Sequence, residues 1–266
     1  MSTLNCIETY IDKEQNHYGC FIIEPLETGQ GITLGNALRR TLLSDLTSFS
    51  IVGTRINNLK HEFTTIEGLR EDVLEVLLNL KEIIFKDSFK LQKQKNLETI
   101  KGFLHVKGPV VITASMLNLP KHLLKIVNPE KYLGTIIDNS EFYLEVDIEK
   151  GKGYRLSEEK TRNYFDFNTS SNQPTTLAVD AIFMPVKKVN YKIKLIHDTQ
   201  GNIKESLSLE IWTNGSISPK RAIQESIKTL MNLFYPLLMN TSFISLTSNA
   251  NKDLLDVKQL NKLSNT

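Results

Sequence analysis

Apolar residues recur at helical spacing in three stretches of the chain, residues 33–46, 64–84 and 218–238. Each stretch places an apolar side chain every three or four residues, which is the period of one face of an α-helix. The pattern therefore predicts three amphipathic helices. Their apolar faces carry Leu34, Ala37, Leu38, Leu42 and Leu43 in the first, Leu69, Val73, Val76, Leu77, Leu80 and Ile84 in the second, and Ile223, Ile227, Leu230, Met231 and Phe234 in the third.

The residues at the start of each predicted helix support these boundaries, because they are typical of helix N-termini. Thr33 is a suitable N-cap for the first helix, and Thr64 with Glu67 has the spacing of a capping box for the second. Ser218 is expected to cap the third helix, where Pro219 takes the first helical position, at which a missing amide hydrogen costs no hydrogen bond.

Elsewhere the pattern changes to short apolar or alternating runs separated by turn residues, which is typical of β-strands. Strands combined with a helix near each end, without regular alternation of strand and helix, predict the α+β class. The expected strands are 18–26, 49–59, 108–114, 141–154, 175–186, 190–202 and 205–215.

Composition and charge exclude several classes of protein. The 266 residues are 40% hydrophobic and 23% charged, values typical of a globular protein with a sizeable core. A net charge of +2 is too small to indicate a nucleic-acid-binding protein. No apolar run approaches the roughly 18 residues of a membrane span, and the N-terminal residues lack the pattern of a secretory signal or a transit peptide. The two cysteines favour a reducing compartment.

Residues 29–31, Gly-Gln-Gly, follow an apolar run and precede a predicted helix, as in loops that bind phosphate. A dinucleotide fingerprint requires a further glycine three residues later, but Leu34 occupies that place and Gly35 comes one residue too late. No Gly-Lys-Ser/Thr of a Walker loop occurs either. A nucleotide site is therefore the less favoured interpretation, and a tight strand-to-helix turn that uses glycine dihedral angles is the favoured one.

Three other patterns are weak candidates for chemistry. HEFTT at 61–65 begins like a zinc-protease motif but has Thr65 in place of the second histidine. His17 and Cys20 have a spacing that suits zinc, but no second ligand pair follows. The basic segment 86–101 suits single-stranded nucleic acid, although a solvated lysine-rich loop is the favoured interpretation. None of these patterns defines a metal or cofactor site.

Arg39 and Arg40 are two of only seven arginines in a chain with 25 lysines. Two adjacent arginines in a lysine-rich chain indicate a site at which planar, multidentate hydrogen bonding matters. A surface salt bridge to a neighbouring acid is the alternative, because such pairs are common.

Several longer blocks resemble a known family. GITLGNALRRTLLSDL at 31–46 and INNLKHEFTTIEGLREDVLEVLLNLKEI at 56–83 closely resemble the N-terminal assembly region of the α subunit of bacterial-type DNA-directed RNA polymerase. The resemblance continues through KIVNPEKYLGTI, EVDIEKGKGY, VDAIFMPVKKVNYKI and LEIWTNGSISPKRAI, and it extends to about residue 238. It implies a homodimer that forms the platform for the β and β′ subunits, without a catalytic residue, metal or cofactor of its own.

The resemblance also implies a domain organisation and sets of contact residues. A dimerisation domain is expected from residues 1–50 and 178–240, with a mostly β domain of residues 51–177 inserted between them. The implied dimer interface consists of Leu34, Leu38, Leu42, Ile223, Ile227, Leu230 and Phe234. The implied contacts with the large subunits are Arg40, Leu43, His61, Glu62, Gly151, Gly153 and Tyr154.

Two further expectations concern the tail and the origin of the chain. Residues 241–266 are polar and rich in Asn and Lys, and they are too few for the family's C-terminal DNA-binding domain. Contact with DNA is therefore expected only indirectly, through the complex. The 25 lysines and 22 asparagines are typical of an A/T-rich genome and favour a plastid (chloroplast) protein, with the bacterial cytoplasm as the alternative.

Overall fold

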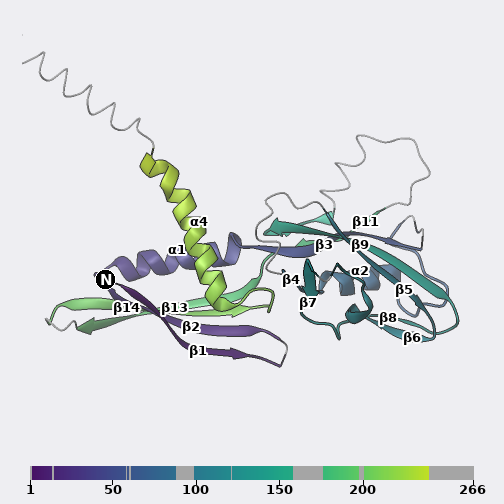
Figure 1. Cartoon of the computed structure of the whole chain (residues 1–266), viewed down its shortest axis with the longest axis horizontal. Helices are drawn as coiled ribbons and strands as arrows, with labels where there is room; N and C mark the ends of the chain where they lie inside the picture. Colours follow the sequence, from purple (N-terminus) through teal and green to yellow (C-terminus); the bar gives the residue numbers. More distant parts are fainter. Residues whose placement is uncertain are drawn as a thin grey trace, which may run out of the picture. The chain divides into compact units, whose positions relative to one another are not determined.

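A computed structural model describes residues 2–13, 15–57, 59, 61–87, 99–120, 122–157, 176–197 and 201–239 (Figure 1). The basic segment 86–101 falls largely outside these residues, and the tail 241–266 falls wholly outside them. The chain forms two compact units, Met1–Ser226 and Ile227–Thr266, which are described separately below. Helices and antiparallel sheets occur together in the first unit, which confirms the predicted α+β class.

Strands from both ends of the chain share one sheet. β1 (Thr3–Ile11) and β2 (His17–Leu26) form the first hairpin, and β13 (Val186–His197) with β14 (Ile203–Thr213) forms the second. β2 pairs with β14, so the order across the sheet is β1-β2-β14-β13 and every pair is antiparallel. In Figure 1 the purple and the green strands accordingly lie side by side.

The intervening residues build a second four-stranded sheet around a separate core. Its order is β11-β3-β9-β5, again antiparallel. Buried aliphatic and aromatic side chains of these strands pack with α2 into one continuous cluster. The bounds are β3 Thr47–Ile56, α2 Val73–Lys81, β4 Phe85–Asp87, β5 Ile100–Lys107, β6 Val110–Thr113, β7 Leu124–Ile126, β8 Tyr132–Ile136, β9 Glu141–Lys152, β10 Tyr154–Arg155, β11 Leu177–Ala178 and β12 Ala181–Ile182.

Helix α1 (Gln30–Ser44) begins at a glycine turn that is closed by a carboxylate of the same chain. Gly29 has φ +89°, a left-handed conformation that glycine adopts without strain. The amides of Gly29 and Gly31 donate to Oε1 and Oε2 of Glu205 at 2.9 and 2.8 Å. A Cβ at Gly31 would lie 2.7 Å from Oε2 of Glu205. The glycines therefore serve a turn, as favoured above, and the helix N-terminus holds a side-chain anion.

The start predicted for this helix was wrong by three residues. Thr33 does not cap it, because its hydroxyl donates to the carbonyl oxygen of Gly29 from within the first turn. Further along, Gly35 allows close approach to β13, since a Cβ there would lie 2.8 Å from the ring of Tyr191.

Helix α2 is much shorter than the predicted helix 64–84. Gly68 has φ +82°, and Leu69 forms an isolated β-bridge with Ile136, so the backbone before residue 73 is not helical. The Thr64 hydroxyl donates to the carbonyl oxygen of His61 and caps no helix. The predicted capping box was therefore wrong, because a glycine turn and a strand-like contact replace the first two helical turns.

The third helix, α4 (Pro219–Met239), agrees with the prediction. It begins at Pro219, and the amide of Arg221 donates to the Ser218 hydroxyl at 3.4 Å, as expected of an N-cap. Ala222, Ile223 and Ser226 are buried within the first unit. From residue 231 to residue 238 the side chains are exposed.

Most predicted strands are present with shifted ends. Residues 18–26, 49–59, 190–202 and 205–215 correspond to β2, β3, β13 and β14, whereas 175–186 contains only two two-residue strands. Strand β1 had no counterpart among the predicted strands. It is exposed along its whole length, so its sequence mixes polar and apolar residues at most positions.

We predict that Glu205→Ala lowers the free energy of unfolding by about 1–3 kcal/mol, because two amides at the start of α1 lose their acceptor. Glu205→Gln keeps one acceptor oxygen and should lose less. Urea unfolding followed by circular dichroism measures the difference.

Glu141→Ala is the matched control for this prediction, because Glu141 is well exposed at the start of β9. It should change the free energy of unfolding by less than ~0.5 kcal/mol. Equal stability of the Glu205→Ala protein and the control would contradict the proposed role of Glu205.

Candidate protein–protein interface

The outer face of α1 carries two arginines that are not engaged by the rest of the described chain. Arg39 and Arg40 are exposed, and neither guanidinium has a hydrogen-bond or ion-pair partner among the described residues. Leu43, one turn after Arg40, is half-buried. A free guanidinium beside an apolar side chain can bind a carboxylate of another protein while its stem packs.

The inner face of α1 is already covered by the chain itself. Leu38 and Leu42 are 1% and 0% exposed, whereas Leu34 is half-buried. The resemblance places all three in a dimer interface, but only Leu34 has side-chain surface left for a partner. Leu38 and Leu42 are covered by other residues of the chain itself.

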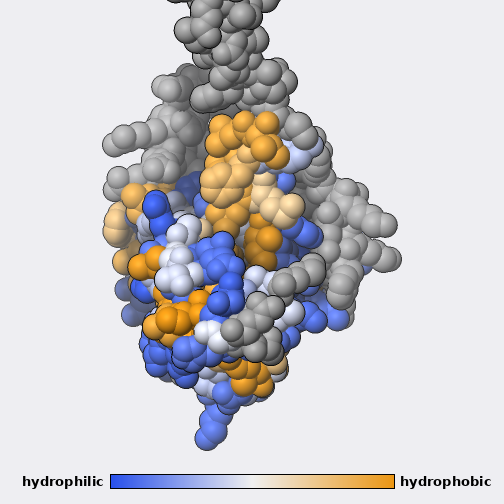
Figure 2. Space-filling view, turned by 90° about the vertical axis from the view of Figure 1, so that its left-hand side faces the viewer, coloured by the Kyte–Doolittle hydropathy of each residue, from blue (hydrophilic) through white to orange (hydrophobic). Residues whose placement is uncertain are grey.

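Helix α4 changes from buried to exposed along its length. Ile223 is fully buried, Ile227 and Leu230 are half-buried, and Phe234 is 59% exposed. Further large apolar side chains follow on the exposed part, and Figure 2 shows hydrophobic surface gathered there. They are Met231, Leu233, Tyr235, Leu237 and Leu238, the last of them 80% exposed.

A corner of the second sheet brings the GKGY segment to the end of α1. Strand β3 starts directly after α1, and its first residue, Thr47, pairs with Lys152 of β9. The Lys152 ammonium also forms an ion pair with Asp45, which caps the C-terminal end of α1. The C-terminal end of α1 and the GKGY segment therefore lie beside each other at this corner, joined through Asp45 and Thr47.

Two glycines and an aromatic ring shape the corner. A Cβ at Gly151 would lie 2.7 Å from the ring of Phe183, so only glycine allows this ring to lie against the strand. Gly153 has φ +70° and turns the chain into the short β10–β12 pair, where Tyr154 lies opposite Ile182. The guanidinium of Arg155 lies 5.1 Å from the centre of the Phe183 ring.

Asp180 fixes this corner to α2. Its carboxylate accepts hydrogen bonds from the Ser157 amide and the Tyr154 hydroxyl, both at 2.9 Å, and from the Lys81 ammonium at 3.2 Å. The amide of Ser157, with the hydroxyl and the ammonium, lowers the pKa of Asp180 from 3.8 to about 2. The exposed Tyr154 side chain is thus held in place by Asp180, which accepts a hydrogen bond from its hydroxyl, and by Lys81, whose ammonium lies over its ring.

The segment HEF lies at the other end of α2. The amide of Val73 donates to the carbonyl oxygen of Thr64, which places the turn of His61 and Glu62 beside the first turn of α2. His61 is exposed, Glu62 is half-buried, and the neighbouring Phe63 is 79% exposed. Between the two ends, Leu74 and Leu78 are exposed one helical turn apart. The face of α2 therefore connects the two predicted contact segments.

Comparison with known proteins agrees with this architecture. Residues 54–184 match the family model described as the RNA polymerase Rpb3/RpoA insert domain. The DNA-directed RNA polymerase subunit alpha of Porphyra purpurea is 44% identical over 258 residues, covering 97% of this chain and 77% of that protein. The chain belongs to the α-subunit family of DNA-directed RNA polymerase.

Relatives with the same name occur in other lineages. The subunit alpha of Rhodomonas salina is 47% identical over 88% of this chain and 69% of its own length. That of Trichormus variabilis is 42% identical over 88% of this chain and 70% of its own length. The chain is thus an α subunit that acts in transcription, within a multi-subunit nucleotidyltransferase, and its relatives include algal, plastid-type proteins.

Reasoning from sequence missed several exposed apolar residues on this face of the molecule. Phe63, Leu74, Leu78 and Ile182 were not singled out. Leu74 and Leu78 were missed because the stripe chosen for the predicted helix 64–84 lies on its buried face. The signal available was the count of apolar residues in VLEVLLNL, which exceeds what one face of a helix accommodates.

The described part of the chain contains no group of three or more His, Cys, Asp and Glu side chains that would hold a metal ion. No helix within it is long and apolar enough to span a membrane. His17 and Cys20 stand three residues apart on β2, so their side chains point to opposite faces of the sheet and cannot chelate one ion together.

We predict that Asp180→Asn destabilises the protein at neutral pH and that the difference from wild type closes in acid. Because the pKa of Asp180 in the folded state lies below 3.8, the ionised carboxyl stabilises the fold above that value. This contribution is lost as the pH falls towards about 2. Thermal unfolding of both proteins over a series of pH values measures the difference.

A matched control is Glu130→Gln, at an exposed carboxylate. Its difference from wild type should be small throughout the series. A difference between Asp180→Asn and wild type that stays constant down to the lowest pH would contradict the proposed role of Asp180.

Proposed function

We propose that this α subunit is a homodimeric scaffold on which the β and β′ subunits of the polymerase assemble. The observation that supports it best is the run of large apolar side chains on the exposed part of α4. Contiguous apolar surface of this kind marks a protein–protein interaction site. A second copy of the chain is the simplest partner, because closed two-fold dimers are the commonest assemblies.

The helix-bearing face of the first sheet supplies further apolar surface for a second copy. Leu4 and Ile11 of β1 point to the same side as Phe21 of β2, as the strand register requires, yet both are exposed. Ile32 on the first turn of α1 is exposed as well. Leu4 and Ile11 extend the proposed interface from the two helices to strand β1.

The roles within the proposed interface differ from residue to residue. Leu34, Ile227, Leu230 and Phe234 retain surface and are proposed to contact the partner subunit directly. Leu38, Leu42 and Ile223 are proposed to act from within one chain, by fixing the helices that carry those contacts. A substitution at Leu38, Leu42 or Ile223 would therefore test folding and not dimerisation.

We propose that the large subunits bind to the surface that runs from α1 over the corner to α2. Arg40 and Leu43 form one end of it, Gly151, Gly153 and Tyr154 form the corner, and α2 leads to His61 and Glu62. Charge and apolar surface alternate along this path, as in interfaces with a few anchoring residues surrounded by weaker contacts.

The domain limits and the compartment are also proposals. The four-stranded sheet made from both ends of the chain supports a dimerisation domain of residues 1–50 and 178–240, with residues 51–177 inserted. The algal relatives support a plastid as the compartment. A net charge of +2 supports contact with DNA through the complex and not by this chain directly.

We predict that the wild-type chain is a dimer in solution and that Phe234→Asp shifts it to a monomer. The substitution places a charge in apolar surface that the partner would desolvate without a compensating ion. Light scattering coupled to size exclusion measures the mass, and circular dichroism confirms the fold.

Ile137→Asp serves as the control, because Ile137 is an exposed apolar residue in a turn of the inserted region. It should leave the dimer intact. A monomeric wild-type protein, or a dimeric Phe234→Asp protein, would rule out the proposed interface.

We predict that Arg40→Ala leaves folding and dimerisation unchanged. It should weaken binding of the β subunit by about 2 kcal/mol, because one side of an anchoring charged contact is removed. Arg40→Lys should recover only part of the loss, because an ammonium cannot reproduce the planar fork. Pull-down of β by purified dimers measures the effect.

Arg39→Ala is the control, because Arg39 is equally exposed on the same helix but points in a different direction. It should retain β at close to the wild-type level. Equal recovery of β by the Arg40→Ala and wild-type dimers would refute the assignment of Arg40.

A further inference from the structure

The face of the first sheet opposite α1 contains a cavity of about 400 Å³ near the β1–β2 turn. Helix α1 packs on the other face, which carries Tyr191 and Ile193. Trp212 and Lys188 lie three residues from Leu209 and Tyr191 along their strands, so their side chains point to the opposite face. The cavity therefore lies on a face that α1 does not cover.

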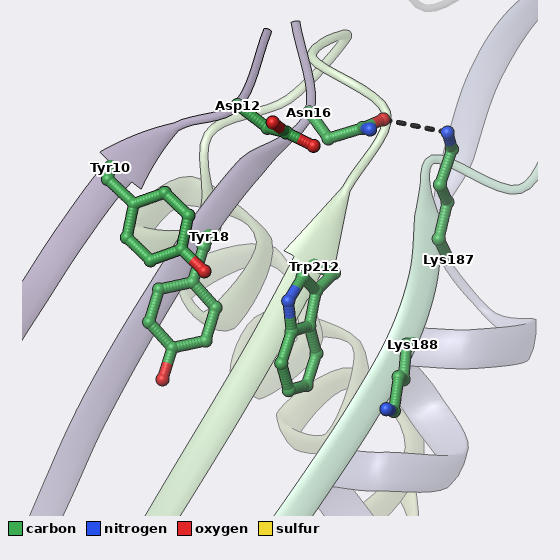
Figure 3. Close-up of a pocket in the computed structure, with 7 residues that line it drawn as sticks. All are labelled: Tyr10, Asp12, Asn16, Tyr18, Lys187, Lys188 and Trp212. Atoms are coloured by element: carbon green, nitrogen blue, oxygen red, sulfur yellow. Dashed lines mark hydrogen bonds between the residues drawn. The ribbon is translucent and has the colours of Figure 1, made fainter. Parts of the chain in front are cut away.

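Four directly paired positions form the wall of this cavity. Tyr10, Tyr18, Trp212 and Lys188 stand opposite one another across β1, β2, β14 and β13 (Figure 3). The ring centres are 4.6 Å apart for the two tyrosines and 5.1 Å apart for Tyr18 and Trp212. The Lys188 ammonium lies 4.9 Å from the centre of the Trp212 ring. The row is a continuous aromatic surface that ends in a cation.

The rim of the cavity is polar and carries a second cation. The Lys187 ammonium donates to Oδ1 of Asn16 at 2.7 Å, and Asn16 lies in the β1–β2 turn that also contains Asp12. Lys192 and Lys194 continue along β13 on the same face as Lys188. In the described part of the chain, none of these four lysines forms an ion pair with a carboxylate.

The arrangement of the rings distinguishes between two kinds of ligand. A nucleobase would stack on an open ring face, but Tyr18 is only 9% exposed and Trp212 is contacted by Tyr18 on one side and by Lys188 on the other. A proline or aliphatic side chain needs only a concave aromatic wall, which is how extended proline-containing peptides bind. Lys187 and Lys188 form no ion pair with a carboxylate of the described residues, which favours carboxylates beside that side chain.

We propose that this cavity binds a short extended segment of a partner protein that places a proline or aliphatic side chain against the aromatic row and acidic residues on Lys187 and Lys188. The segment is defined by its chemistry and need not come from β or β′. The inference does not depend on the proposed homodimer or on the large-subunit surface.

Trp212 is the only tryptophan in the chain, so intrinsic tryptophan fluorescence of the full-length protein reports on this cavity directly. The probe is a short synthetic peptide in which glutamate and proline alternate. We expect it to cause a saturable change in Trp212 emission. A peptide of equal length in which lysine and proline alternate should cause none at the same concentrations.

Two variants locate the binding site. Tyr10→Ser removes a ring from the exposed strand β1, and a double variant with Lys187→Ala and Lys188→Ala removes the two cations. Each should weaken binding of the acidic peptide by about tenfold or more, as is usual for an anchoring aromatic or charged contact. Lys125→Ala, at an exposed lysine of β7, is the matched control and should bind like wild type.

Three results would overturn the proposal. They are the absence of a saturable signal with the acidic peptide, binding that the Tyr10 and lysine variants leave unchanged, and tighter binding of a single-stranded oligonucleotide than of the peptide. Calorimetry with the same peptide checks that the signal measures binding. Circular dichroism shows whether a variant that fails to bind is folded.

Discussion

The carboxylate of Glu205 joins the first turn of α1 to the sheet formed by both ends of the chain. Its two oxygens accept hydrogen bonds from the amides of Gly29 and Gly31. These amides have no partner within the helix because they lie at its N-terminal end. The negative charge is also favourable at that end of the helix dipole. Since Glu205 comes from β14 and the glycines follow β2, one interaction unites segments 174 residues apart in the sequence.

The position of α1 decides which surfaces remain for partners. With its glycine side against β13, the helix buries Leu38 and Leu42 and presents Arg39 and Arg40 outward. Its C-terminal end leads directly into β3, and through the pairing of β3 with β9 it sets the place of the GKGY corner. The proposed large-subunit surface therefore depends on the same packing that joins α1 to the sheet formed by both ends of the chain.

The pattern of apolar and polar residues predicted those parts of the fold in which the local sequence and the packing of the whole chain favour the same element. Helix α4 follows its cap, its proline and its apolar stripe, and β2, β13 and β14 follow their apolar runs. The helix predicted for 64–84 failed in its first half, because a Gly68 turn and a strand contact of Leu69 depend on residues far along the chain. Periodicity within a segment carries no information about such contacts.

In the candidate site, too, the sequence indicated individual residues but not the long-range contacts between them. The resemblance supplied Arg40, Leu43 and the GKGY segment, and the structure joins the end of α1 to that segment through a strand pairing that no local pattern encodes. The glycine turn resembled a phosphate loop because both use amides at a helix N-terminus to bind an anion. Only the fold reveals that the anion is Glu205. Equally, helical spacing marked Leu38 as part of an apolar face, but it could not separate burial by the chain itself from burial by a partner.

The central claim is that this chain is the scaffold of a polymerase, present as a pair. The most direct measurement is native mass spectrometry of the complex purified from its source through a tag on this chain. We expect an assembly in which two copies of this chain accompany one β and one β′ subunit, with polymerase activity in the same fraction. Recovery of the chain with a single copy per complex, or without the large subunits, would contradict it.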